Sequence, residues 1–329
     1  MYKEFVSPIL DHLDSETGHH LALNFLNRLQ QIPGGLELLR KLYSFEDPKL
    51  EREVLGLKFK NPVGVAAGLD KNGVAVASLH ALGFSFVIVG SVTLEPQEGN
   101  PKPRQWYKNG MSFNSLGFPS QGAKEVNENL NQYKNRNGLI GISIGRNKNT
   151  SNQDAPKEYA KIMEILYGNA DFFELGISSP NTVDLGELQK KDYLHAILQA
   201  TKCDKPVFIK ISPDLTLREL DDVIDLASYF KVGIAASNTT KDPNLKLNFG
   251  EEFKNKIGGF GGNSQVFSDM STRQIIYING QVPVIGIGGI NGPERAREKF
   301  DAGASLVAIN TALREKGLGI AGLINRGIL

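Results

Sequence analysis

The sequence predicts a closed parallel (β/α)8 barrel, an α/β fold, preceded by an N-terminal two-helix extension. From Pro62 onward short apolar runs alternate with helical patterns, and most of these runs are continuously apolar, as in strands covered on both faces. An open doubly wound sheet is the alternative, but no GxGxxG motif with an acidic residue about 20 positions later follows the first run. The expected strands are 63–67, 86–90, 139–144, 172–177, 207–211, 232–236, 282–287 and 305–309.

Helical patterns fill the intervals between these strands. Asp214 with Thr216, and the segment Asn291-Gly292-Pro293, supply the caps and the early proline that begin helices. Two connections, 93–138 and 240–264, are much longer, and long loops at the carboxyl end of barrel strands usually form lids or substrate walls. The expected helices are 159–166, 187–201, 217–229, 267–278 and 293–302.

Residues 1–50 are expected to form a separate helical extension, with residues 51–329 forming the barrel. One apolar face comprises Leu21, Phe25, Leu26 and Leu29, and a second, after the break at Pro33-Gly34-Gly35, comprises Leu36, Leu39 and Tyr43. Such faces either cap the barrel by packing on it or open onto a membrane or an apolar ligand.

Composition narrows the function classes. The chain has 329 residues, 40% of them apolar, which suffices for one large barrel, and its net charge of +1 without basic runs predicts no nucleic-acid partner. The lone Cys203 excludes an intramolecular disulfide and a CxxC metal site. His12, Glu16 and His20 have the spacing of metal ligands on a helix, but no further ligand is in view and no metal is expected. No membrane span and no signal peptide are expected either.

Polar side chains follow most of the expected strands. The most informative segment is Gly176-Ile177-Ser178-Ser179-Pro180-Asn181-Thr182, where two hydroxyls and a carboxamide come directly after a buried strand that Pro180 ends. Ligands of (β/α)8 barrels bind at this end of the strands. The other strand ends supply Asp70-Lys71, Ser91, Ser143, Lys210, Ser237-Asn238-Thr239, Gly288-Gly289 and Asn310-Thr311.

The lysines and glycines at these ends indicate an anionic ligand. Lys71 and Lys210 stand in an otherwise uncharged lining, and a buried lysine needs a negative partner or loses its proton. Gly286, Gly288 and Gly289 after the seventh strand, with the turn after the eighth, fit the usual phosphate position of such barrels.

Taken together, these residues resemble the dihydroorotate dehydrogenases, and within them the quinone-dependent class 2, over nearly the whole chain. A serine at the base position, Ser179, and the helical extension are class 2 features, whereas class 1 members use a cysteine and Cys203 lies far from that position. The matching segments are Asn61-Pro62-Val63-Gly64, Ala66-Ala67-Gly68-Leu69-Asp70-Lys71, Gly99-Asn100-Pro101-Lys102-Pro103-Arg104, residues 177–182, Lys210-Ile211-Ser212-Pro213-Asp214, Asn238-Thr239-Thr240 and Gly286-Ile287-Gly288-Gly289-Ile290.

The resemblance implies an FMN-dependent oxidoreductase that converts (S)-dihydroorotate to orotate with a quinone acceptor, in de novo pyrimidine biosynthesis. It implies that Lys210 lies near the N1/O2 edge of the flavin and stabilises negative charge there. The implied FMN-binding positions are Ala67, Gly68, Leu69, Asp70, Lys71, Ser91, Ser143, Lys210, Ser237, Gly262, Gly289, Asn310 and Thr311.

For the substrate, the resemblance implies two catalytic residues, Ser179 and Lys71. Ser179 would remove a carbon-bound proton while hydride passes to the flavin, and an unassisted serine is a weak base that its surroundings must activate. A cyclic carboxylated amide, dihydroorotate or a relative, would be held by Lys71, Asn114, Ser115, Leu116, Gly117, Phe118, Asn181, Asn238 and Thr239.

The helical extension implies peripheral attachment to the cytoplasmic side of the cell membrane, for a protein otherwise cytoplasmic, and a frame for the quinone entrance. Arg104, a polar residue that the family places near the quinone, is retained. Asn310 stands where the family has a tyrosine on the quinone side.

Several positions depart from the family pattern. Ser143 and Gly176 replace asparagines, Ser115 replaces an arginine, and Pro119 and Ser120 replace asparagines. Loss of two carboxamides would weaken dihydroorotate binding by roughly 2–6 kcal/mol if nothing compensates. The alternatives are therefore a repurposed flavoenzyme of specialised metabolism, with room beside Gly176 for a bulkier substrate, and a non-enzymatic flavin-binding barrel.

Overall fold

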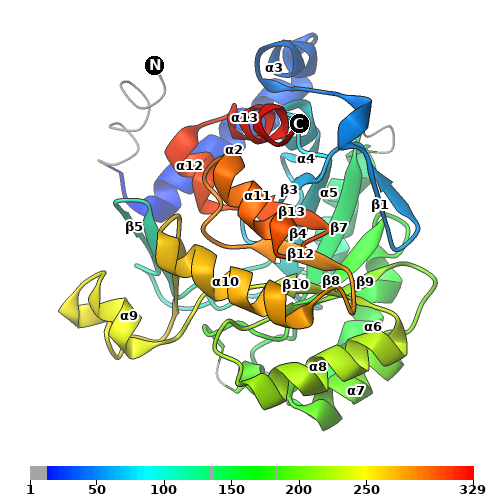
Figure 1. The fold of residues 1–329 in the computed structure, drawn as a ribbon, viewed down its shortest axis with the longest axis vertical. Helices are drawn as coiled ribbons and strands as arrows, with labels where there is room; N and C mark the ends of the chain where they lie inside the picture. The colour runs from blue at the N-terminus through cyan, green and yellow to red at the C-terminus, as the bar shows by residue number, and fades with distance from the viewer. Residues whose placement is uncertain (1–12, 134–136, 183) are drawn as a thin grey trace.

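The computed structural model describes residues 13–133, 137–182 and 184–329, and it confirms the closed barrel. Eight parallel strands are hydrogen-bonded in the order β10-β12-β13-β3-β4-β7-β8-β9, and they form the centre of the molecule (Figure 1). Each expected strand corresponds to one of them. Their bounds are β3 (Val63–Val65), β4 (Phe86–Val92), β7 (Leu139–Ile144), β8 (Phe172–Leu175), β9 (Val207–Ile211), β10 (Gly233–Ala236), β12 (Val284–Ile287) and β13 (Leu306–Ile309).

The five helices expected between the strands are present. Thr216 begins α8 with a capping box shared with Glu219, and Pro293 occupies the first turn of α11 after Gly292. The expected helix 187–201 is divided, because a 3-10 turn at Leu185–Gln189 precedes α7. These helices are α6 (Ala155–Leu166), α7 (Lys191–Ala200), α8 (Leu217–Phe230), α10 (Gln265–Ile278) and α11 (Pro293–Asp301); α4 (Val76–Ala81), α5 (Ala123–Leu130), α12 (Thr311–Lys316) and α13 (Ile320–Ile328) complete the circuit.

Aromatic side chains fill the barrel interior at its amino-terminal end. Phe86, Phe172 and Phe208 come from β4, β8 and β9, and their rings meet at centroid distances of 5.6–6.0 Å. Phe59 closes the bottom from the hairpin of β1 (Arg52–Val54) and β2 (Leu57–Phe59). Since side chains alternate along a strand, the residue two positions after each ring also faces inward, one layer nearer the rim.

The two long connections meet in a small sheet that the sequence did not reveal. β5 (Gln105–Lys108) and β6 (Met111–Asn114) form a hairpin, and β11 (Gly259–Gly262) pairs with β6 from the other connection. An aromatic cluster of its own stabilises this sheet, and α9 (Pro243–Leu247) projects beside it at the lower left of Figure 1. The cluster contains Trp106, Phe113, Phe249, Phe253, Phe260 and Phe267.

The extension consists of α2 (Ser15–Gln31) and α3 (Gly35–Tyr43), as expected. Leu26 and Leu39 are buried against the core, and α2 packs on α4 and β5. A second apolar row points outward: Leu21, Phe25 and Leu38 are 52%, 56% and 53% exposed. The helices therefore both cap the barrel and present an apolar surface. Among the described residues, no helix combines the length and hydropathy needed to cross a bilayer.

Candidate active site

The candidate site is a cavity at the carboxyl end of the barrel strands, made of two adjoining chambers. The first holds about 700 Å³ of space and the second about 990 Å³, part of it open to solvent. Both are lined by Lys210, Asn238 and Asn310, so the chambers are continuous. The small sheet β5–β6–β11 supplies walls for both and covers the barrel mouth.

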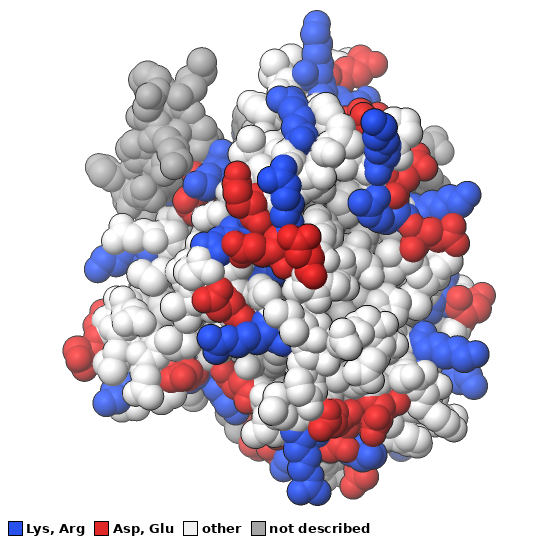
Figure 2. Space-filling model, viewed as in Figure 1, with Lys and Arg blue, Asp and Glu red and all other residues white. Residues whose placement is uncertain are grey.

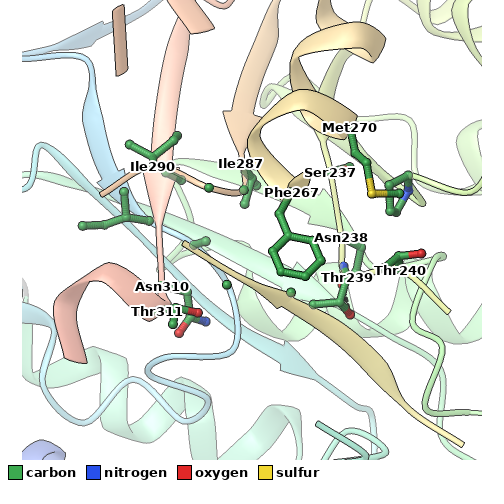
Figure 3. A pocket seen from close by; sticks show the side chains of 18 of the residues that line it. Ser237, Asn238, Thr239, Thr240, Phe267, Met270, Ile287, Ile290, Asn310 and Thr311 are labelled. Carbon is green, nitrogen blue, oxygen red and sulfur yellow. Dashed lines mark hydrogen bonds between the residues drawn. The ribbon is translucent and has the colours of Figure 1, made fainter. Parts of the chain in front are cut away.

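The first chamber is lined mainly by glycine and small or apolar side chains. Gly289 has a left-handed backbone (φ 70°), and a Cβ there would lie 2.5 Å from the Ser268 backbone nitrogen. A Cβ at Gly261 would lie 2.9 Å from Thr239 Cγ2. In Figure 3, Asn310 and Thr311 lie on one side of the chamber and Asn238 and Thr239 on the other, with Phe267 projecting between them. The absence of side chains therefore lets β11 pack directly on Thr239 at the barrel rim and lets the turn at Gly289 pack directly on α10.

The second chamber gathers carboxamides and hydroxyls from distant parts of the chain. Asn181 donates through Nδ2 to Asn114 Oδ1 at 2.5 Å, and Asn238 donates to Ser178 Oγ at 3.1 Å. The Asn181 Oδ1 atom is buried and has no hydrogen-bond partner among the described residues. An unpartnered buried acceptor is costly, so this atom indicates a missing hydrogen-bond donor such as a ligand N–H.

Ser179 lies in the loop that follows β8, after Gly176, Ile177 and Ser178, and is 5% exposed. The hydrogen bond recorded for its hydroxyl oxygen within the described residues comes from the Asn181 backbone N–H at 3.3 Å. Ser179 shares the second chamber with Lys71, Asn114, Asn181 and Asn238. The sequence predicted that these residues share one site, and in the fold they line one chamber.

Two lysines face the cavity in different electrostatic surroundings. Burial lowers the pKa of Lys71 to about 8, with Glu16 acting in the opposite direction and Arg104 adding to the decrease. Lys210 instead has a paired carboxylate, because its Nζ atom lies 3.4 Å from Glu174 Oε1. Burial also lowers the pKa of His19 well below its ordinary value, with Lys71 as the second cause.

Some predicted site residues do not line the cavity and instead hold the backbone around it. The Asp70 carboxylate is fully buried and accepts from the backbone N–H groups of Val74 and Ala75 at 3.0 and 2.8 Å, so it anchors the turn that leads to α4. Leu69 is also buried, and Ser115 is held through its backbone N–H by the Arg104 carbonyl at 2.7 Å. Gly117 lines an outer groove instead.

Two of the positions that depart from the family pattern, Ser143 and Gly176, lie together beside Ser91. Ser143 is fully buried, and its hydroxyl lies 2.9 Å from that of Ser91, which lines the second chamber. A Cβ at Gly176 would lie 2.8 Å from the Ile144 carbonyl oxygen and 3.1 Å from Ser91 Oγ. A side chain at position 176 would therefore collide with β7, and the room expected there for a bulkier substrate stays a prediction.

The remaining predicted residues line one chamber or both. They are Ala67, Gly68, Lys71, Ser91, Asn114, Leu116, Phe118, Ser179, Asn181, Lys210, Ser237, Asn238, Thr239, Gly262, Gly289, Asn310 and Thr311. Sequence reasoning missed His19 from α2, Gln105 and Ser112 from the small sheet, and Phe267 and Met270 from α10. None of these residues directly follows a barrel strand, so a search for polar groups at strand ends could not find them.

Arg104 connects the extension to the site. Its Nε and Nη2 atoms donate to the Glu16 carboxylate of α2, the shortest distance being 2.7 Å, and its Nη1 donates to the Asn100 carbonyl oxygen at 2.9 Å. Asn100 Nδ2 in turn donates to the Asn181 carbonyl oxygen at 3.0 Å. Glu16, which has the spacing of a metal ligand relative to His12 and His20, therefore forms an ion pair with Arg104. His12 lies outside the described residues.

A closed barrel with a polar, lysine-bearing cavity at the carboxyl end of its strands is the architecture of a (β/α)8-barrel enzyme. The family model for dihydroorotate dehydrogenase matches residues 49–329. The chain therefore belongs to the dihydroorotate dehydrogenase family of oxidoreductases.

Named relatives are of the quinone type. A dihydroorotate dehydrogenase (quinone) of Christiangramia forsetii is 40% identical, over 100% of this chain and 99% of that protein. One from a Synechococcus strain is 38% identical, over 100% of this chain and 92% of that protein. The crystal structure of the Eimeria tenella DHODH in complex with ferulenol has a TM-score of 0.85 and 30% identity, and the match covers 97% of this chain and 92% of that one.

The Glu16–Arg104 pair is predicted to hold α2 on the barrel. Glu16→Gln should lower the free energy of unfolding by about 1–3 kcal/mol at pH 7, the usual range for a hydrogen bond to a charged group. Although burial acts against it, the Arg104 guanidinium holds the pKa of Glu16 below its ordinary value. This stabilisation is therefore present above the unfolded-state pKa and is lost as pH falls through the lower folded-state value.

Urea unfolding of wild type and Glu16→Gln at several pH values checks this prediction. The difference between the two proteins should shrink at acidic pH. Glu37→Gln on α3 is the control and should match wild type throughout. An equal difference at pH 7 and pH 3 would show that the carboxylate charge is not the cause.

Proposed function

We propose that this protein is an FMN-dependent enzyme that oxidises (S)-dihydroorotate to orotate and passes the electrons to a quinone. The observation that carries the proposal is the second chamber, where Ser179, Lys71 and the carboxamides of Asn114, Asn181 and Asn238 face one space. The first chamber adjoins it and ends at Gly288 and Gly289, which follow β12. The alternative is an enzyme repurposed for a different substrate, and growth of a pyrimidine-requiring strain distinguishes the two.

The residues present fit an FMN group. Gly288, Gly289 and Thr311 would surround the phosphate, where backbone N–H groups bind anions. Ala67, Gly68 and Ser91 would pack beside the ring system, and Lys210 would lie at its pyrimidine edge. The flavin supplies a hydride acceptor for a substrate bound in the second chamber.

The chain's own groups then have defined roles. Lys71 would hold the substrate carboxylate, and Asn114, Asn181 and Asn238 would hold its ring amides, Asn181 Oδ1 accepting from a ring N–H. Ser179 would take the proton from the carbon next to the one that loses hydride. Because Ser179 is nearly fully buried, its hydroxyl has little contact with bulk water.

The outward row of α2 and α3 supports a membrane-facing role. Leu21, Phe25 and Leu38 form an apolar surface on helices that also reach the cavity through His19. We propose that this surface places the protein peripherally on the cytoplasmic side of the cell membrane, where a hydrophobic quinone can enter.

Ser179 is predicted to be the general base. Ser179→Ala should slow flavin reduction by dihydroorotate by at least about 100-fold, the usual contribution of a positioned base, while FMN stays bound. Stopped-flow absorbance of the flavin measures this. Ser178→Ala is the matched control and should slow reduction less, since Ser178 is absent from the second chamber's lining, although its hydroxyl accepts from Asn238. Unchanged reduction in Ser179→Ala would remove Ser179 from the mechanism.

Lys71 is predicted to make ligand binding pH-dependent. With its pKa lowered to about 8, Lys71 is charged below that pH and neutral above it. The dissociation constant for orotate should therefore be level below pH 8 and rise up to about tenfold per pH unit above it. Titration of the flavin spectrum with orotate measures this. Lys71→Arg stays charged and should lack the break near pH 8; a break that persists assigns it to another group.

The apolar row is predicted to bind membranes. Leu21→Ser/Phe25→Ser should weaken co-sedimentation with lipid vesicles and raise KM for a long-chain quinone, while flavin reduction by dihydroorotate stays unchanged. Leu217→Ser on α8 is the control, because Leu217 is 62% exposed and lies outside the extension. Equal vesicle binding by all three proteins would contradict the membrane assignment.

Substrate identity is tested in a strain that requires pyrimidines because it lacks its own dihydroorotate dehydrogenase. Wild type should restore growth and Ser179→Ala should not, and anaerobic dihydroorotate should bleach the purified yellow protein. Failure of soluble, flavin-loaded wild type in both assays would show that the Ser143 and Gly176 replacements mark a different substrate. A colourless protein that takes up no FMN would favour a non-catalytic barrel.

A further inference from the structure

The eight barrel strands contain one acidic and one basic residue, Glu174 and Lys210. Glu174 follows Phe172 by two positions and Lys210 follows Phe208 by two, so both side chains face the interior one layer above the aromatic core. Glu174 is fully buried and Lys210 is 8% exposed. The two charges form a pair directly beneath the cavity.

The pair is incompletely satisfied at the carboxylate. Glu174 Oε1 lies 3.4 Å from Lys210 Nζ, whereas Glu174 Oε2 is buried and has no hydrogen-bond partner among the described residues. Taking a carboxylate out of water costs several kcal/mol, and one long contact does not offset that cost. A stabilising role in the fold therefore does not explain why Glu174 carries a charge.

The position of Lys210 supplies an explanation. Lys210 lines both chambers, so its ammonium charge acts on whatever occupies them, while Glu174 is fully buried beneath it. An unpaired ammonium in this low-dielectric setting would strongly favour a negative ligand beside it. With Glu174 in place, the floor of the cavity carries a net charge close to zero.

We propose that Glu174 is a positioning residue that sets the effective charge of Lys210 and thereby the reduction potential of the bound flavin. The inference rests on the proposed function. A hydride brings two electrons and one proton, so it adds one negative charge to the flavin. By partly neutralising Lys210, Glu174 lowers the preference of the pocket for the reduced form and makes it easier for the quinone to accept the electrons.

The test uses full-length holoprotein and the isosteric variant Glu174→Gln. Removing the negative charge should tighten binding of reduced FMN relative to oxidised FMN by about tenfold, equivalent to a midpoint potential about 30 mV more positive for a two-electron couple. Equilibration with redox dyes measures the potential, and fluorescence titration of the apoprotein measures the affinity for oxidised FMN.

Three variants separate this role from a packing role. Glu158→Gln, a buried carboxylate on α6 that accepts from the Asn147 backbone, should leave the potential unchanged. Glu174→Asp keeps the charge and should stay near the wild-type potential, although it loses a methylene from a packed site. In a Lys210→Met background, Glu174→Gln should no longer shift the potential upward.

The inference is overturned if Glu174→Gln has the wild-type potential, or if Glu174→Asp shifts it as far as Glu174→Gln does. It is equally overturned if the upward shift persists without Lys210. If Glu174→Gln does not fold, the test uses the potentials of Glu174→Asp, Glu158→Gln and Lys210→Met. Loss of the Lys210 charge must lower the potential. A wild-type protein that binds no FMN removes the proposed function itself, whereas a wild type that binds FMN and oxidises dihydroorotate confines any failure to this inference.

Discussion

Closure of the barrel requires the carboxyl ends of eight parallel strands to share one rim, and the site depends on this constraint. Residues as far apart in sequence as Lys71, Ser179 and Asn310 reach a common cavity because each follows a different strand. The aromatic layer beneath them fixes the strand spacing and excludes water from the interior. Polar groups at the rim consequently lie in a low-dielectric setting, where their charges and hydrogen bonds have large effects.

The rim alone does not enclose the cavity. The sheet formed by β5, β6 and β11 covers it, and the glycines of β11 permit that sheet to lie directly on Thr239. The extension closes the other side through a continuous set of hydrogen bonds that runs from Glu16 through Arg104 and Asn100 to Asn181. The helices that carry the exposed apolar row are thereby joined mechanically to the backbone of Asn181, a proposed substrate-binding residue.

The two lysines of the cavity illustrate two ways of keeping a cation in a protein interior. Within the described part of the chain no carboxylate forms an ion pair with Lys71, and burial lowers its pKa to about 8, so it remains responsive to an incoming anion. Lys210 has Glu174 as a fixed partner within the barrel. The first arrangement suits a site that must exchange an anionic substrate, and the second suits a resident group whose charge changes during each turnover.

The sequence by itself determined the strand and helix order, the barrel class, and the strand-end groups from Lys71 to Thr311, because strand burial, helix caps and polar strand ends are local properties of the chain. It could not place His19, Gln105 or Ser112 in the cavity, since these residues lie on elements whose docking depends on contacts distant in sequence. Nor could it show that β7 approaches Gly176 too closely for a Cβ, since that contact joins residues of different strands and loops. The Glu174–Lys210 and Glu16–Arg104 pairs were decided only by the tertiary structure, because each joins residues that barrel closure or helix docking brings together.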